Sequence, residues 1–298
     1  MGVTLEQLRI FLAVAEREHV TRAAEALNLT QSAVSGAISA LETRHDVRLF
    51  NRVGRRIELT DEGRTFVDSA RAILALVRVA ETTLADLSDV RRGTLTVFAS
   101  QTIASYWLPR HLVAFHTRYP QIDLRLEVGN TAQCVRAVTM GSADLGFVEG
   151  GIDEPRLQAD LIAKDRLVAV VGCDHPWFSA TPDLPQALFQ TEWALREPGS
   201  GTRSSFEDGL RSLGVAPEGL RVAMELPSNE AICTAVETSK LATVVSQSVA
   251  DAGIRVGRLK VLPLDLPSRD FRIIRHKERH QSRAGKAFVD LLAQAVPV

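Results

Sequence analysis

The sequence predicts an α/β protein with an all-α winged helix-turn-helix head, a long linker helix and a larger C-terminal α/β region. Three observations predict it. Short amphipathic segments separated by turn signals fill the first 45 residues, a proline-free stretch from 60 to 88 carries a seven-residue apolar repeat, and strands alternate with helices from residue 93 onward. With 298 residues, 45% of them hydrophobic, the chain can form more than one packed core.

Capping signals define the helices of the head. Thr4 and Gln7 have the spacing of a capping box, so a first helix is expected to begin after Thr4. Thr21 is expected to cap a second helix, and Asn28 to end it in the left-handed conformation. Thr30 is then expected to cap a third helix, which completes a helix-turn-helix.

The third helix, residues 31–42, carries a polar arc opposite an apolar face. Short hydroxyls and amides suit base edges and phosphates in a major groove, and the second helix of such a unit lies in that groove. The predicted DNA-binding residues of this helix and its cap are Thr30, Gln31, Ser32, Ser35 and Ser39. Gly36 weakens the helix, and either leaves room for DNA or costs a contact. The alternative is an ordinary three-helix bundle without a ligand.

A basic hairpin follows, in residues 48–60, where apolar residues alternate around a turn at Gly54. Arg52, Arg55 and Arg56 lie near this turn, with Arg48 just before, and such a wing can place guanidinium groups on phosphates. We therefore add Arg52, Arg55 and Arg56 to the predicted DNA-binding residues. A solvated basic turn is the alternative.

This N-terminal pattern resembles the signature of the LysR-type transcriptional regulators. The resemblance is carried by Leu8, Phe11, Ala23, Ala24, Leu27, residues 31–35, Ile38, residues 41–42, residues 49–50 and Arg52. It implies a winged helix-turn-helix, a dimerising linker helix and a C-terminal effector domain. By the same resemblance, a double-stranded DNA operator is the expected macromolecular partner, and RNA polymerase is a further candidate.

The linker segment has an uninterrupted apolar seam. Its members are Phe66, Ala70, Ile73, Val77, Ala80, Leu84 and Leu87, spaced alternately four and three residues apart. Such spacing is typical of a coiled coil, and a helix of this length, ~40 Å, exceeds what a small head can cover. We expect a homodimer through this helix, or a homotetramer built from such dimers. A long helix packed on its own domain is the alternative.

The charged break at residues 89–93 is the best domain boundary, and the alternation after it predicts a largely parallel sheet. Residues 144–146 and His175-Pro176 resemble landmarks of the LysR effector domain, which is similar to two-lobed periplasmic binding proteins. The expected domains are 1–60, 61–89 and 93–298. Lobe I would contain about 93–163 and 268–298, and lobe II about 164–267.

Polar residues follow several predicted strands, where α/β folds bind ligands. Ser100-Gln101-Thr102 follow the first strand, Asn130 begins the next helix, and Ser200, Gly201, Thr202 and Arg203 begin a helix further along. Glycines, hydroxyls and helix N-termini favour anions. We expect these residues to bind a small anionic effector, with Arg203 neutralising charge. Glu149 also follows a strand, and its charge would oppose an anion unless it is paired or protonated. Ordinary caps and turns are the alternative.

The segment 196–203 is similar to one in the sulfur-assimilation and carbon-fixation branches of the family. In the sulfur branch, the hydroxyl pair after the first strand binds an oxyanion. That resemblance favours a sulfite- or sulfate-like effector, and leaves a phosphorylated or carboxylate metabolite as the alternative.

Composition and motifs limit the classes of protein to which this chain can belong. The formal net charge is −1, and no signal segment or membrane-length apolar stretch occurs, so a cytoplasmic protein without a membrane partner is expected. Cys134, Cys173 and Cys233 lack zinc or disulfide spacing. We find no nucleotide loop or nucleophile motif and expect no cofactor, metal or catalysis. A small-molecule-binding protein with an accessory helical head, or an enzyme that uses the cleft, are the competing classes.

Overall fold

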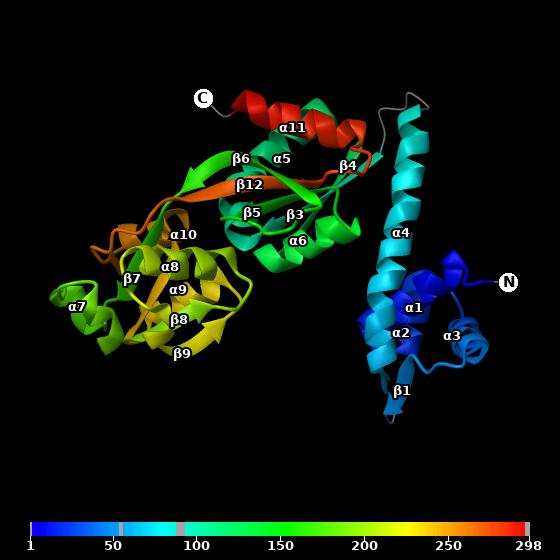
Figure 1. Ribbon diagram of the computed structural model, residues 1–298, viewed down its shortest axis with the longest axis horizontal. Helices are drawn as coiled ribbons and strands as arrows, with labels where there is room; N and C mark the ends of the chain where they lie inside the picture. The colour runs from blue at the N-terminus through cyan, green and yellow to red at the C-terminus, as the bar shows by residue number, and fades with distance from the viewer. Residues whose placement is uncertain (1, 54–55, 88–92, 296–298) are drawn as a thin grey trace. The chain divides into compact units, whose positions relative to one another are not determined.

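The computed structural model describes residues 2–53, 56–87 and 93–295, which include helices and strands of two compact units (Figure 1). The smaller unit contains residues 1–84 and 140–142, and the larger contains 85–139 and 143–298. The charged break predicted as the domain boundary falls largely at residues 88–92, outside the described residues. In the parts of the chain that are described, none of the helices combines the length and the apolar character needed to cross a bilayer.

The head has the predicted helix-turn-helix with a wing. Its elements are α1 (Leu5–Arg17), α2 (Val20–Leu27), α3 (Gln31–His45), β1 (Phe50–Val53) and β2 (Arg56–Leu59). Thr4 and Gln7 form both halves of the capping box, Asn28 has a φ of 54°, and the Thr30 hydroxyl accepts from the amide of Ala33. The N-cap of α2 is His19 rather than the expected Thr21, because the helix already begins at Val20.

The apolar seam of the linker helix α4 (Asp61–Leu87) is buried near the start of the helix and exposed farther along. Near its start, Phe66 and the fully buried Ala70 pack into the core of the head. Farther along, Ile73 and Leu84 are 42% and 67% exposed. Head packing therefore covers only the first part of the seam.

The larger unit has two lobes, each built on a five-stranded sheet (Figure 1). In lobe I the strand order is β4-β3-β5-β12-β6. The strands are β3 (Gly93–Ser100), β4 (Ile122–Gly129), β5 (Leu145–Glu149), β6 (Leu157–Asp165) and β12 (Arg269–His276). One face is covered by α5 (Leu108–Arg118) and α11 (Arg283–Ala295), and the other by α6 (Thr131–Met140).

Lobe II follows the same plan, with the strand order β11-β7-β10-β8-β9. The strands are β7 (Leu167–Gly172), β8 (Glu192–Arg196), β9 (Arg221–Leu226), β10 (Leu241–Ser246) and β11 (Leu259–Val261). The principal helices are α8 (Gly201–Ser212), on one face, and α9 (Asn229–Glu237) and α10 (Gln247–Arg255), on the other. Short helical segments are η1 (Ile103–Trp107), α7 (Pro176–Ser179), η2 (Gln186–Gln190) and η3 (Pro217–Gly219).

Both sheets are mixed, and in each of them four of the five strands run in the same direction, which agrees with the expectation of a largely parallel sheet. In lobe I, β3 runs parallel to β4 and β5, whereas β12 runs antiparallel to β5 and β6. In lobe II, β7 runs antiparallel to both β10 and β11. The reversed strands arise where the chain crosses between the lobes. The chain leaves lobe I through β6, which leads directly into β7 of lobe II, and it returns to lobe I in β12. These crossing strands are not part of a repeated strand-helix-strand unit.

Candidate functional site

The polar arc of α3 lies at the surface of the head, as a DNA-reading helix requires. Val34, Ile38 and Leu41 are buried against α1 and α2. Gln31, Ser32 and Ser39 are exposed together with the cap Thr30, and Ser35 is half-buried. The hydroxyls of Thr30 and Ser32 are 3.0 Å apart, which preorganises the first turn.

Hydrogen bonds fix the wing to the helices. The Glu42 carboxylate, at the end of α3, accepts from the backbone amides of Leu49 and Phe50 at 2.7 and 3.1 Å. Thr60 donates its hydroxyl to the Arg48 carbonyl at 2.7 Å. Of the other predicted arginines, Arg52 lies in β1, Arg56 lies in β2, and Arg55 lies outside the described residues.

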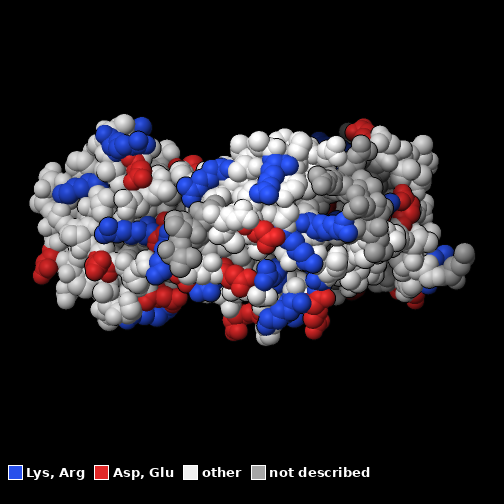
Figure 2. Space-filling model, turned by 90° about the horizontal axis from the view of Figure 1, so that it is seen from above, with Lys and Arg blue, Asp and Glu red and all other residues white. Residues whose placement is uncertain are grey.

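One face of the molecule carries charges of both signs. On the face shown in Figure 2, Lys and Arg are interspersed with Asp and Glu, and no patch of one sign stands out. The prediction of a DNA-binding surface on the head depends on α3 and the wing, and not on overall charge.

In the larger unit, polar side chains from both lobes meet at strand ends and helix N-termini. Ser100 is the last residue of β3 and Thr102 follows it, and these residues are 2% and 1% exposed. Gln101 connects the lobes, because its side-chain amide donates to the Pro227 carbonyl at 2.5 Å and accepts from the Asn229 amide at 3.1 Å. We call this junction the interlobe site.

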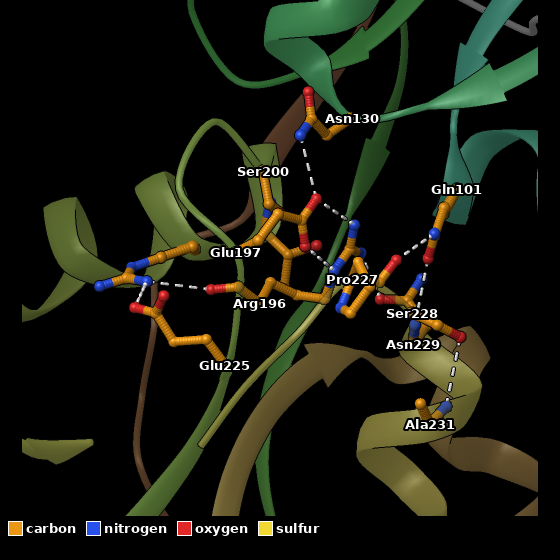
Figure 3. A network of polar contacts seen from close by, with 12 residues as sticks. Gln101, Asn130, Arg196, Glu197, Ser200, Glu225, Pro227, Ser228, Asn229 and Ala231 are labelled. Atoms are coloured by element: carbon orange, nitrogen blue, oxygen red, sulfur yellow. Dashed lines mark hydrogen bonds and ion pairs between the residues drawn. The ribbon is translucent and has the colours of Figure 1, made fainter. Parts of the chain in front are cut away.

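One chain of hydrogen bonds runs across the interlobe site (Figure 3). It begins at the Thr102 hydroxyl, which accepts from the Asn229 side chain at 3.1 Å. Asn229 accepts from Arg196 at 2.8 Å, and Arg196 makes a two-pronged ion pair with Glu197 at 2.8 and 3.0 Å. Asn130, which caps α6 of lobe I, donates to Glu197 at 3.0 Å. The chain thus joins lobe I to lobe II at both of its ends.

The charge of Glu197 is stabilised within this chain. Burial by itself raises the pKa of Glu197, but hydrogen bonds from Arg196 and Asn130, together with the charge of Arg196, hold that pKa below its ordinary value. Glu197 is therefore an ionised acceptor at neutral pH, and the bond from Asn130 is charge-assisted.

A second chain is centred on Arg269, the first residue of β12. Its guanidinium donates to the Thr202 hydroxyl at 3.0 Å and to Asp165 at 2.8 Å. Glu149 lies 4.0 Å from the same guanidinium and accepts from the Thr131 hydroxyl at 3.2 Å. Ser246 donates to Asp165 at 2.7 Å. Two buried arginines, in this chain and the first, therefore face three carboxylates.

The N-terminus of α8 approaches lobe I closely. Ser200 is its N-cap and accepts from the Thr202 amide at 3.2 Å. A Cβ added to Gly201 would lie 2.6 Å from the Thr131 hydroxyl and 2.8 Å from a Glu149 oxygen. Only glycine permits this approach, because any side chain would collide with lobe I.

Arg269 donates to one of the predicted effector hydroxyls, that of Thr202, whereas Arg203 has other partners. Arg203 donates to Glu207 at 2.9 Å and to the Arg196 carbonyl at 3.2 Å, and pairs with Glu225. These acceptors all belong to lobe II, and the role expected of Arg203 toward an anion stays a prediction. The other predicted effector residues, Ser100, Gln101, Thr102, Asn130, Glu149, Ser200, Gly201 and Thr202, all lie in the interlobe site.

Two buried polar atoms of the interlobe site lack a hydrogen bond. One is the Ser100 hydroxyl. The other is Nη2 of Arg269, which makes an ion pair with Asp165 at 2.7 Å but has no acceptor in hydrogen-bond geometry. Buried polar groups without hydrogen bonds cost free energy, so the Ser100 hydroxyl is a candidate contact for a ligand.

Comparison with known proteins identifies both parts of the chain. Residues 5–64 match the model of bacterial regulatory helix-turn-helix proteins of the lysR family, and residues 88–297 match the LysR substrate binding domain. A probable RuBisCO transcriptional regulator of Phaeodactylum tricornutum is 32% identical over 290 residues, covering 96% of this chain and 94% of the relative.

Solved structures agree on the fold. Full-length CbnR complexed with its target DNA superposes with a TM-score of 0.70 at 24% identity, covering 98% of this chain and all of that one. The regulatory domain of Synechocystis CcmR, in complex with 2-PG, gives 0.61 at 28% identity, covering 68% of this chain and 97% of that domain.

Proposed function

This chain belongs to the LysR family of bacterial helix-turn-helix regulators, and on that premise we propose that a small oxyanion in the interlobe site changes its operator binding. Membership makes it a DNA-binding transcription regulator with a C-terminal effector-binding domain. The exposed polar arc of α3 supports the DNA-reading role of Thr30, Gln31, Ser32, Ser35 and Ser39.

The observation that carries the oxyanion proposal is the buried Ser100 hydroxyl, which has no hydrogen bond, in the same interlobe site as the buried guanidinium of Arg269. Both can donate, and the first turn of α8 beside them adds backbone N–H groups and the positive end of a helix dipole. A compact ligand made of acceptor oxygens fits these donors. The hydroxyls of Thr102 and Thr202, both buried, supply further polar contacts.

Glu149 supports a narrower class of oxyanion. Its carboxylate is 3% exposed, and the three carboxylates of the site already outnumber the two arginines. A fully deprotonated dianion would be repelled, whereas an oxyanion that keeps a proton can donate it to Glu149. Hydrogen sulfite has that proton near neutral pH and sulfate does not. Within the sulfite- or sulfate-like class, we therefore favour sulfite.

A phosphorylated or carboxylate metabolite is the second candidate. It is supported by the CcmR regulatory domain, which is similar to this chain and was solved with 2-PG. A monoprotonated phosphate group would satisfy Glu149 by the same rule as hydrogen sulfite. The two candidates differ in size, because the metabolite extends beyond the oxyanion group.

Effector binding can act on the operator through lobe closure. Gln101, Asn130 and the Ala132 amide, which donates to Gly199 at 3.1 Å, already connect the lobes. A ligand that contacts Ser100 on one lobe and Thr202 on the other stabilises the closed arrangement. Such a ligand changes operator binding only if it binds one arrangement of the protein more tightly than another and the heads fit the DNA better in one of them.

We further propose that α4 forms the dimer contact. Its exposed apolar side chains, Ile73, Leu76 and Leu84, recur at helical spacing on one face. Two such faces from two copies can bury each other in a coiled coil. A twofold dimer would present α3 twice, which suits an operator with two half-sites.

Sulfite is expected to raise the melting temperature of the full chain by about 5–10 °C at a concentration 100 times its Kd, because it binds only the folded state. Ser100→Ala should remove most of this shift. Thr243→Val is the matched control, because its hydroxyl is also buried and unpartnered but lies within β10. Equal shifts for the two variants, or a sulfite effect no larger than that of sodium chloride, would contradict the proposal.

Glu149→Gln is expected to reverse the discrimination between sulfite and sulfate. Glutamine removes a negative charge and offers N–H donors, so sulfate should gain affinity relative to sulfite by about 10–100-fold. Isothermal titration of both anions measures the ratio of their Kd values. Glu207→Gln, on α8 but paired with Arg203, is the control that should leave the ratio unchanged. An unchanged ratio in Glu149→Gln would exclude the proposed role of Glu149.

A further inference from the structure

Gly36 occupies the second turn of α3 and is exposed. A Cβ added there would meet no atom within 4 Å. Its φ is not positive, so the backbone would accept any side chain without strain. The described residues of this protein therefore contain no packing or conformational reason for glycine at this position.

Glycine nevertheless destabilises the helix. In a helix interior it is less favourable than every residue except proline, because it loses more backbone freedom on folding. The contrast with Gly63 is informative, because a Cβ there would collide with the Leu49 carbonyl, which gives that glycine an internal cause. At Gly36 the described residues supply no such internal cause, so we consider a molecule that approaches α3 from outside.

The position of Gly36 on α3 identifies that molecule. With about 3.6 residues per turn, Ser32, Gly36 and Ser39 lie in the middle of the surface opposite the buried Val34, Ile38 and Leu41. The family match over residues 5–64 makes this the surface of a DNA-reading helix. The centre of that surface faces the groove when the helix lies in it.

We propose that Gly36 is the point at which α3 comes closest to the floor of the major groove. Without a side chain at this position, the helix can lie deep enough for the short hydroxyls of Ser32 and Ser39 to reach base edges. A serine side chain extends only two atoms from the backbone, so its reach depends on how closely the helix axis approaches the bases. The inference depends on the DNA-binding role of the family and is independent of the effector.

The test uses Gly36→Ala and Gly36→Leu in the full chain, with a duplex selected from a random pool by the unsubstituted protein. Both substitutions should raise the melting temperature by a few degrees, because they improve helix propensity. The Kd for the selected duplex should rise about tenfold for alanine and further for leucine. Binding to a shuffled duplex should change less, because nonspecific binding depends on phosphate contacts.

Val113→Ala is the matched control, because it also improves helix propensity at an exposed position but lies on α5 of the larger unit. The control should leave the Kd for the selected duplex unchanged. A weaker Kd in the Gly36 variants can then be attributed to the added side chain between α3 and the DNA, and not to a more stable helix. Unchanged or tighter binding by Gly36→Ala would overturn the proposal. So would a lower melting temperature, which would reveal an internal need for glycine, or an equal loss on both duplexes.

Discussion

Alanine at Gln31, Ser32 and Ser35 together is expected to abolish selective operator binding while the head remains folded. These side chains carry the only amide and two of the hydroxyls on the exposed arc of α3 and its cap. A good contact to a base edge is worth about 1–3 kcal/mol of discrimination, so losing several should weaken selective binding more than about 100-fold. Fluorescence anisotropy on selected and shuffled duplexes measures the loss.

The stability of the triple variant should change little, because Gln31 and Ser32 are exposed and Ser35 is half-buried. Circular dichroism should show an intact head. Arg52→Ala is the contrasting variant: it should weaken binding to both duplexes similarly and reduce the salt dependence by about one phosphate contact. Selective binding that survives in the triple variant would remove α3 from its assigned role.

Aspartate at Ile73 and Leu84 is expected to convert the dimer into monomers. Both side chains are exposed on α4 in the single chain, so the substitutions should not disturb the fold of the head. In a dimer they would bury four carboxylates where apolar contacts of about 1.5–3 kcal/mol per side chain had been. Sedimentation at micromolar concentration should then show half the native mass or less.

The control for this experiment is Arg64→Asp, which places the same carboxylate at an exposed position on the side of α4 opposite Ile73 and Leu84. Its assembly should be unchanged. If Ile73→Asp with Leu84→Asp keeps the native assembly, the dimer contact lies elsewhere on the molecule. Operator binding by that variant should fall as well, because a monomer reaches one half-site only.

Features that depend on near neighbours could be predicted from the sequence. The capping box of Thr4 and Gln7, the left-handed Asn28 and the Thr30 cap are all present, since each involves residues at most a few positions apart. The wing is also present, because alternation around a turn sets the register of β1 and β2. Thr21 was wrong as a cap because capping signals locate helix ends only to within a residue or two.

Some residues of the interlobe site could be predicted from the sequence, and others could not. Ser100, Thr102, Ser200 and Thr202 follow strands or begin helices, which is a local signal. Arg269 and Asn229 carry no such signal. Arg269 binds Asp165 across 104 positions and Asn229 binds Thr102 across 127, and only the fold brings these residues together.

Arg203 shows why a local motif cannot assign a charge to a site. Its position at the start of α8 suggested a cation for an anion site, but Glu207, Glu225 and the Arg196 carbonyl engage it within lobe II. Glu225 lies on β9, 22 positions after Arg203 in the chain. The pairing of β9 with β8 brings Glu225 close to Arg203. The tertiary structure therefore determines which acceptors lie close enough to bind the Arg203 guanidinium.

The sequence by itself determined the family, the helix-turn-helix with its exposed polar arc, and the apolar face of α4, because caps and hydrophobic period act over a few residues. Tertiary structure alone decided that the sheets are mixed, that Arg269 rather than Arg203 lies among the buried hydroxyls, and that three carboxylates surround two arginines. The physical reason is that strand direction and ion pairing depend on which distant segments become neighbours. Chain folding sets those neighbours, and no local pattern specifies them.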